Sequence, residues 1–309
     1  MKRRELMLAL SGVGASAAWR SRVALGAEKK APVVPGAPGP VCFFSKFLPK
    51  LGPGPMAAVL KKIGYDGVDL TVRPRGHIEP ADAEKALPGA VAAIREQGLS
   101  VPIVTTEILS ASEPFSRAIL ATAGKAGVPM FKPGYWSYRY EDIHKELAEV
   151  GRAVRGLTQL SRRCGIRLGF HNHGDRIGGP IWDAVQILDK LDPRWAGYYF
   201  DTRHAFAEGG QSAWKVATHL VGPRVMAVSV KDFHWEKTGQ GWRIRKVPLG
   251  QGMVDVEAIL TILRGHGFAG PISVHLEYPI EGGEDAVLAA AERDLGTLRK
   301  ILARVYAQA

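Results

Sequence analysis

The sequence predicts an α/β fold, a single-domain (β/α)8 TIM barrel that begins at residue 41. Short β-rich runs alternate with amphipathic segments eight times, and several of those segments end at a glycine. The chain of 309 residues is also long enough for a barrel of about 250 residues. Alternating strands and helices imply a parallel sheet with crossover connections. An open doubly wound sheet is the alternative, but no glycine-rich phosphate fingerprint follows the first β-rich run.

Each expected strand is a short apolar or β-branched run between turn residues. The expected strands are residues 41–44, 67–72, 101–106, 128–132, 166–171, 196–201, 224–231 and 271–277. The amphipathic segments between them predict helices. These are residues 55–63, 83–97, 114–126, 140–163, 181–191, 212–220, 254–266 and 285–307. A glycine just past a helix is typical of a left-handed C-terminal cap. We expect that role for Gly64, Gly98, Gly127, Gly165 and Gly267.

One segment interrupts the repeat. Residues 235–247 alternate around a turn that contains Gly239 and Gly241, which predicts a β-hairpin inserted after strand seven. Connections at this end of a barrel carry the chemistry. The hairpin therefore either covers the site or has no contact with a ligand.

The N-terminus resembles a twin-arginine export signal. A basic start with Arg3 and Arg4 precedes a weakly apolar stretch and small residues up to Ala27. The alternative is a short basic amphipathic helix. Residues 28–40 contain four prolines and are interpreted as a linker to the barrel at 41–309. We therefore expect an exported protein of the periplasm or cell envelope.

Composition excludes several classes of protein. Apolar residues make up 46% and charged residues 23%, as in a globular protein. No apolar run reaches the roughly 18 residues of a membrane span. The net charge is +11, and the Lys and Arg residues are spread along the chain with no run of five, which indicates a solvated basic surface. Cys42 and Cys164 are too few for a disulfide framework, and we expect both to be buried and reduced.

Ionisable residues gather where the expected strands end, which is where such barrels carry their active sites. Six of the nine histidines fall there: His77, His171, His173, His204, His234 and His275. The other three fall in helices or at their ends: His144, His219 and His266. Because side chains alternate along a strand, the later strands present shared faces. These faces hold His171 with His173, Tyr199 with Asp201, Ser229 with Lys231, and Ser273 with His275 and Glu277. On the first four strands the candidates are Ser45 or Lys46, Asp69 with Thr71 and Arg73, Thr105 with Glu107, and Lys132.

Buried charges must be paired or bind a metal, because isolated ones are too unfavourable. Two imidazoles and two carboxylates are available: His171, Asp201, His275 and Glu277. This mixture suits zinc, manganese, cobalt or iron better than calcium. The alternative for each residue is a hydrogen-bonded group that closes the top of the barrel. Three further residues are expected to form salt bridges or to support the ligands: Arg203, His204 and Asp232.

Six segments together resemble the xylose isomerase-like barrel superfamily. They are GVDL at 67–70, GFHNH at 169–173, FDTRHA at 200–205, VKDF at 230–233, PLGQGMVD at 248–255 and ISVHLEY at 272–278. The superfamily includes sugar isomerases and epimerases, inosose dehydratases, hydroxypyruvate isomerases and apurinic endonucleases. Typical members bind one divalent metal through a Glu, an Asp, a His and a Glu at the ends of strands five to eight.

The resemblance assigns positions in that ligand set. Asp201 matches the Asp, His171 or a neighbour stands for the first Glu, and Ser229 replaces the His. The last Glu corresponds to His275 or Glu277. The resemblance thus implies a divalent metal (Mn, Zn, Co or Mg) held by His171, Asp201 and Glu277, with at best two of the four ligands retained.

We therefore expect a sugar isomerase/epimerase-like enzyme that moves a proton next to the carbonyl of a small carbohydrate. The catalytic candidates are Glu277, His275, Lys231 and His173. The candidates for substrate binding are Lys132, Arg203, His204 and Trp235; Trp136, Trp235 and Trp242 either stack on a sugar or serve packing. A lyase or dehydratase of the same superfamily and a non-catalytic sugar-binding barrel of the envelope are the alternatives. A nuclease is disfavoured because the ligand carboxylates are too few, so no nucleic-acid partner is expected, and the oligomeric state stays open.

Overall fold

The structure is a computed structural model that describes residues 38–307. The expected export signal and most of the expected linker lie outside the described residues.

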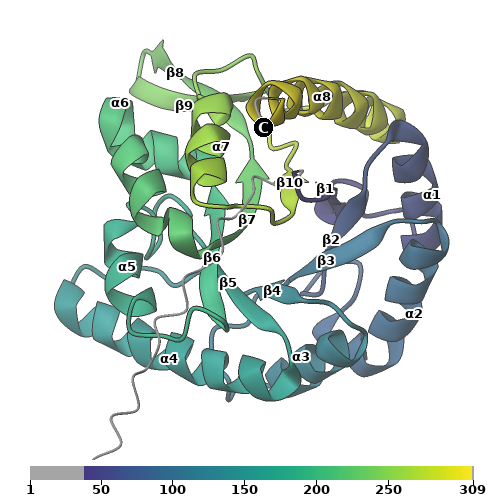
Figure 1. Cartoon of the computed structure of the whole chain (residues 1–309), viewed down its shortest axis with the longest axis horizontal. Coiled ribbons are helices and arrows are strands. Elements are labelled where there is room, and N and C mark those ends of the chain that lie inside the picture. The colour runs from purple at the N-terminus through teal and green to yellow at the C-terminus, as the bar shows by residue number, and fades with distance from the viewer. Residues whose placement is uncertain (1–37, 308–309) are drawn as a thin grey trace, which may run out of the picture. The chain divides into compact units, whose positions relative to one another are not determined.

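Within residues 38–307, eight parallel strands close into a barrel in the order β1-β10-β7-β6-β5-β4-β3-β2 (Figure 1). The strands are β1 Val41–Phe44, β2 Gly67–Thr71, β3 Ser100–Thr105, β4 Met130–Lys132, β5 Arg167–His171, β6 Ala196–Asp201, β7 Val225–Val230 and β10 Ile272–Val274. β1 pairs with β2 on one side and with β10 on the other, which completes the ring. The predicted TIM barrel is confirmed.

The helices lie outside the ring of strands (Figure 1). They are α1 Pro53–Ile63, α2 Ala83–Glu96, α3 Ser116–Lys125, α4 Ile143–Cys164, α5 Trp182–Leu188, α6 Thr202–Val221, α7 Val256–Gly265 and α8 Gly283–Tyr306. Short 3-10 turns cover Ser45–Phe47, Pro80–Asp82 and Gly222–Arg224. The five glycines predicted to cap helices all have positive φ, from 69° at Gly165 to 106° at Gly64. At this φ a side chain would be strained, which is why glycine ends these helices.

The predicted hairpin is confirmed and is longer than expected. Its arms are β8 Asp232–Thr238 and β9 Gly241–Val247, and β8 begins directly after β7.

Two boundaries differ from the prediction in ways that affect the site. Helix α6 begins at Thr202, ten residues before the expected start, because Asp201 caps it by accepting the backbone N–H of His204 at 2.9 Å. Strand β10 ends at Val274, so His275 and Glu277 lie in the loop that follows it.

The apolar core forms two clusters. The larger one fills the space between strands and helices. The smaller one lies inside the barrel and consists of Ile103, Met130, Tyr199 and Ala227. Side chains that point inward nearer the strand ends are polar, among them Asp69, Thr105, Asp201 and Ser229, all nearly or fully buried. The interior therefore changes from apolar to ionisable toward the C-terminal ends of the strands.

The cysteines are free thiols, but only Cys42 is buried. Cys164 is half-buried, contrary to the prediction, because it is the last residue of α4 and lies at the helix end. Searched over residues 38–307, the helices include none with the length and apolarity that a membrane crossing needs.

Candidate functional site

A cavity of about 140 Å³ lies at the C-terminal ends of the strands. Its wall consists of Phe44, Lys46, Arg73, Thr105, Lys132, Tyr135, His171, His173, Tyr199, His275 and Glu277. Nine of these eleven residues were predicted to lie at the strand ends, and five of the nine were predicted to have a role in the site: Lys132, His171, His173, His275 and Glu277. The strand ends thus bring together residues that are far apart in the chain, such as Lys46 and Glu277, which are 231 positions apart. We call this space the mouth cavity.

Asp201 and Lys231 form a buried ion pair beside the mouth cavity. Asp201 ends β6 and Lys231 follows β7, and these strands are neighbours in the barrel. The Lys231 Nζ lies 2.8 Å from Asp201 Oδ2, and both side chains are almost fully buried. Ser229 also donates its hydroxyl to Asp201 Oδ2 at 2.6 Å. Burial alone would raise the pKa of Asp201, but Lys231 holds it well below the usual value.

Glu277 forms ion pairs with three lysine ammonium groups. Its Oε1 lies 3.3 Å from both Lys46 Nζ and Lys231 Nζ, and its Oε2 lies 3.7 Å from Lys246 Nζ. Burial opposes ionisation, but Lys231 and Lys46 keep the pKa of Glu277 far below the usual value of a glutamate. Glu277 is therefore held as an anion and is a weak proton acceptor, which does not suit a general base.

A second polar network crosses the barrel interior. Asp69 accepts hydrogen bonds from the hydroxyls of Thr105 at 2.6 Å, Tyr199 at 2.7 Å and Ser273 at 3.2 Å. Burial raises the pKa of Asp69 to about 6 despite these donors. The Tyr199 hydroxyl also lies 3.1 Å from Nε2 of His275. Because the hydroxyl proton is used on Asp69, Nε2 of His275 donates to the tyrosine oxygen.

His275 is therefore a neutral ring with a fixed orientation. It stacks on Phe44 with ring centroids 4.4 Å apart. Burial and the nearby Lys231 hold its pKa well below the usual value of a histidine. Its buried Nδ1 has no hydrogen-bond partner among the described residues.

His173 presents a free ring nitrogen. Its Nδ1 lies 2.7 Å from the backbone oxygen of Gly174, which can only accept, so Nδ1 carries the proton in the neutral ring. Burial lowers the pKa of His173, so the ring is neutral near pH 7 and its Nε2 keeps a lone pair. His171 also lines the cavity, and burial lowers its pKa to about 4 although its Nε2 is 3.4 Å from Asp201.

Tyr135 is one of the two wall residues that the sequence did not suggest; the other is Phe44. Its ring lies 3.6 Å from the Lys132 Nζ and 4.5 Å, centroid to centroid, from the ring of His173. Tyr135 lies in the loop three residues after β4. That position on the functional end of the barrel is the one signal that marked it in the sequence.

Three predicted substrate-binding residues do not line the mouth cavity. His204 and Arg203 are buried behind it, where His204 Nδ1 accepts the N–H of Gly174 at 2.8 Å and Arg203 contacts the same ring. Trp235 lies on the hairpin against Phe233 and is 41% exposed. Trp136 stacks on Phe170, which is a packing role.

Two motif residues hold the backbone of the site. Asn172 exchanges two hydrogen bonds with the backbone of Asp201, at 2.7 and 3.0 Å, which joins the ends of β5 and β6. Asp232 accepts the N–H groups of Gly250, Gly252 and Val254 within 3.1 Å. A Cβ on Gly252 would lie 2.1 Å from Asp232, so this loop requires glycine.

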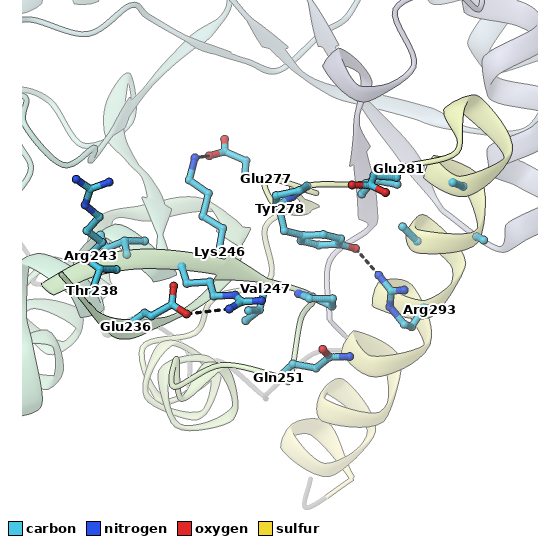
Figure 2. Close-up of a pocket in the computed structure, with 18 residues that line it drawn as sticks. Glu236, Thr238, Arg243, Lys246, Val247, Gln251, Glu277, Tyr278, Glu281 and Arg293 are labelled. Atoms are coloured by element: carbon cyan, nitrogen blue, oxygen red, sulfur yellow. Dashed lines mark hydrogen bonds and ion pairs between the residues drawn. The ribbon is translucent and has the colours of Figure 1, made fainter. Parts of the chain in front are cut away.

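A larger groove of about 1210 Å³ joins the site at Glu277. It runs between the hairpin, the loop after β10 and α8. Figure 2 shows Lys246 reaching from the hairpin to Glu277, and Tyr278 next to Arg293 of α8. Glu277 lines both the groove and the mouth cavity. The hairpin therefore contributes a side chain to the rim of the site.

The residues present do not fit a divalent metal. Within residues 38–307, no three His, Cys, Asp or Glu side chains are arranged to hold one. Where the resemblance implies an imidazole ligand, Ser229 presents a hydroxyl that already donates to Asp201. The Lys231 ammonium lies between Asp201 and Glu277, where it supplies the positive charge that two carboxylates need. The predicted set of His171, Asp201 and Glu277 is thus not assembled as a ligand set.

The fold and the site define a class: a (β/α)8 barrel with ionisable side chains converging on a cavity at the strand ends. The model of the xylose isomerase-like TIM barrel family matches residues 57–301, and the chain belongs to this family. Among curated proteins, inosose dehydratases from Salmonella agona (strain SL483) and Bacillus velezensis are both 26% identical to it. The matches cover 40% and 44% of this chain and 44% and 50% of those proteins, so the chain spans half of their length or less.

Solved structures share the fold. The IOLI protein with a bound zinc atom has a TM-score of 0.67 at 15% identity, over 87% of this chain and 98% of that one. A xylose isomerase-like barrel protein from Mycobacterium smegmatis in complex with magnesium has a TM-score of 0.66 at 14% identity, over 86% of this chain and 97% of that one. D-Psicose 3-epimerase from Clostridium cellulolyticum H10 with D-tagatose has a TM-score of 0.63 at 13% identity, over 85% of this chain and 99% of that one. The fold is thus shared with a sugar epimerase, and part of the chain is similar to inosose dehydratases.

Proposed function

We propose that the protein is an enzyme that transfers a proton at the carbon next to a carbonyl group of a small polyhydroxylated substrate, as an isomerase or epimerase. The observation that carries the proposal is the wall of the mouth cavity. It combines His173, a neutral and only partly buried imidazole that has a free lone pair, with three basic side chains: Lys46, Arg73 and Lys132.

His173 is the base. Its Nδ1–H donates to the Gly174 carbonyl, which fixes the tautomer and leaves Nε2 as the proton acceptor. An imidazole whose ordinary pKa is about 6.5 can take and return a proton near neutral pH. The neighbouring rings of Tyr135 and His204, with centroids 4.5 and 4.0 Å away, keep it in place.

Lys46 and Arg73 stabilise the enediolate. Removal of the proton puts negative charge on the carbonyl oxygen, and positive groups prepared at that position stabilise it. Lys46 is anchored by Glu277 at 3.3 Å, and Arg73 lies 3.5 Å from Glu107. The carbohydrate hydroxyls then find donors and acceptors around the same wall.

A dehydratase is the second candidate. The curated relatives reported above, at 26% identity, are inosose dehydratases. A dehydratase removes water by β-elimination, which supports that reaction here. The first step, proton removal next to a carbonyl, is shared with isomerisation. A hydroxyl on the next carbon then leaves as water.

Deuterium incorporation tests the proposal. The full protein is incubated in D2O with a panel of ketoses and keto-glycosides, and NMR follows the hydrogen next to each carbonyl. We expect exchange with at least one substrate, a loss of about 100-fold or more in His173→Gln, and unchanged exchange in His144→Gln, an exposed histidine on α4.

Two results would decide against it. No exchange with any sugar, together with saturable sugar binding by calorimetry, would make the barrel a binding protein of the envelope. Full exchange in His173→Gln would assign the base elsewhere. An unsaturated product formed along with exchange would select the dehydratase.

We further propose that the protein is exported. Its support is the sequence of the first 27 residues, with Arg3 and Arg4 before a weakly apolar stretch. The substrate would then be a carbohydrate available in the cell envelope.

A further inference from the structure

Lys132 is a buried amine on the wall of the mouth cavity. It is the last residue of β4 and is 2% exposed. Its backbone oxygen accepts both the N–H and the hydroxyl of Thr106, at 2.9 and 2.8 Å, so the strand end that carries it is held firmly. The side chain therefore starts from a fixed position and lines the cavity.

Lys132 differs from the other lysines around the site. Lys46, Lys231 and Lys246 each form an ion pair with the carboxylate of Glu277. Among residues 38–307 the Lys132 Nζ forms no ion pair, and its closest described contact is the face of the Tyr135 ring at 3.6 Å from the centroid. An aromatic face attracts a cation much more weakly than a carboxylate does when both are buried.

The electrostatic surroundings favour the uncharged amine. Burial and the nearby guanidinium of Arg73 lower the pKa of Lys132 to about 7, although Asp69 and Glu107 act in the other direction. An ordinary lysine has a pKa of about 10.4 and is almost entirely protonated at pH 7. An uncharged amine has the lone pair that attack on a carbonyl requires.

We propose that Lys132 is the nucleophile of the site and forms an imine with the carbonyl group of the substrate. This inference rests on the proposed function, in which the substrate carries a carbonyl. Nζ forms a bond to the carbonyl carbon, and the carbonyl oxygen becomes the hydroxyl of a carbinolamine. One Nζ proton passes to that oxygen as the carbinolamine forms. The hydroxyl then takes up a proton from the solvent and leaves as water, so that a protonated C=N bond replaces the C=O bond.

The protonated imine would accept electrons from the neighbouring carbon. When a base removes the proton from that carbon, the electron pair moves toward nitrogen and cancels its positive charge. The free Nε2 of His173 lines the same cavity and serves as that base. The protonated imine thus stabilises the carbanion. At this site the charges of Asp201 and Glu277 are neutralised by the ammonium of Lys231 and not by a metal ion.

Reductive trapping tests the inference. The full protein is mixed with dihydroxyacetone and sodium cyanoborohydride, which reduces an imine to a stable secondary amine, and peptide mass spectrometry locates the adduct. We expect near-complete modification of Lys132 before any other lysine. Lys132→Arg keeps a cation but cannot form an imine, and it should lose the adduct. Lys300→Met, which removes an exposed lysine of α8, should keep it.

Adducts spread over exposed lysines, with Lys132 unmodified in a protein whose thermal unfolding is intact, would overturn the inference. If trapping fails while the wild-type protein still exchanges deuterium, the proposed function stands and the imine does not. If Lys132 is trapped and no sugar exchanges deuterium, the nucleophile stands and the proposed proton transfer fails.

Discussion

The ammonium of Lys231 lies 2.8 Å from Oδ2 of Asp201, and neither side chain is more than 2% exposed. The same ammonium is 3.3 Å from Glu277. A buried pair of this kind adds little net stability, but removing one partner leaves an uncompensated charge. Lys231 therefore connects two acidic residues that would otherwise repel each other.

We predict that Lys231→Met lowers the free energy of unfolding by about 3–5 kcal/mol, because Asp201 and Glu277 lose their shared cation. Urea denaturation measures the change. The matched control is Arg194→Met, which breaks an exposed pair with Asp192 and should change stability by less than about 1 kcal/mol. Equal effects of the two substitutions would show that the Lys231 pair is not an isolated buried charge pair.

A chelator should not affect the protein. Ser229 and Lys231 occupy the surroundings of Asp201 in a way that does not suit a divalent metal. After dialysis against EDTA we expect the unfolding temperature and the deuterium exchange rate to stay the same. Loss of exchange that is restored by Mn²⁺, Zn²⁺, Co²⁺ or Mg²⁺ would contradict this and return His171, Asp201 and Glu277 to the role of ligands.

Stability should depend on pH through Asp69. Its pKa rises from 3.8 to about 6 on folding, so the folded protein holds a proton that the unfolded chain releases between these values. The contribution to stability is complete below about pH 4 and is lost as pH rises to about 6, by at most about 1.4 kcal/mol per pH unit. Asp69→Asn should flatten this part of the curve. The measurement is urea unfolding at several pH values, and an identical slope in the variant would refute the assignment.

Export should require the paired arginines. Replacing Arg3 and Arg4 with lysine keeps the net charge but removes the feature on which twin-arginine recognition depends. We expect the precursor to accumulate in the cytoplasm, as measured by cell fractionation and immunoblotting. Lys replacements at Arg20 and Arg22 serve as the charge-matched control and should still be exported. Equal export of both variants would point to another route.

Local signals predicted most elements of the barrel. Gly64 and Gly165 end helices because they have positive φ, and that preference belongs to glycine itself. The start of α6 was missed because Asp201 was considered as a ligand or as a group that closes the barrel, and not as a helix cap, although its carboxylate accepts the N–H of His204. Asp232 was predicted to form a salt bridge or to support the ligands, whereas its carboxylate accepts three backbone N–H groups of the loop after the hairpin.

The positions of strands and helix ends along the chain depend on residues that are close in the sequence. The repeat of these elements was therefore sufficient to predict the barrel and the end at which its ionisable residues meet. The pairing of charges there depends on which strands become neighbours when the barrel closes. Glu277 meets Lys46 and Lys231 because β10 lies between β1 and β7. Lys132 is left with the Tyr135 ring for the same reason, since β4 is on another part of the ring of strands. Coulomb interactions act through space, and only the closed barrel brings these side chains within reach of one another.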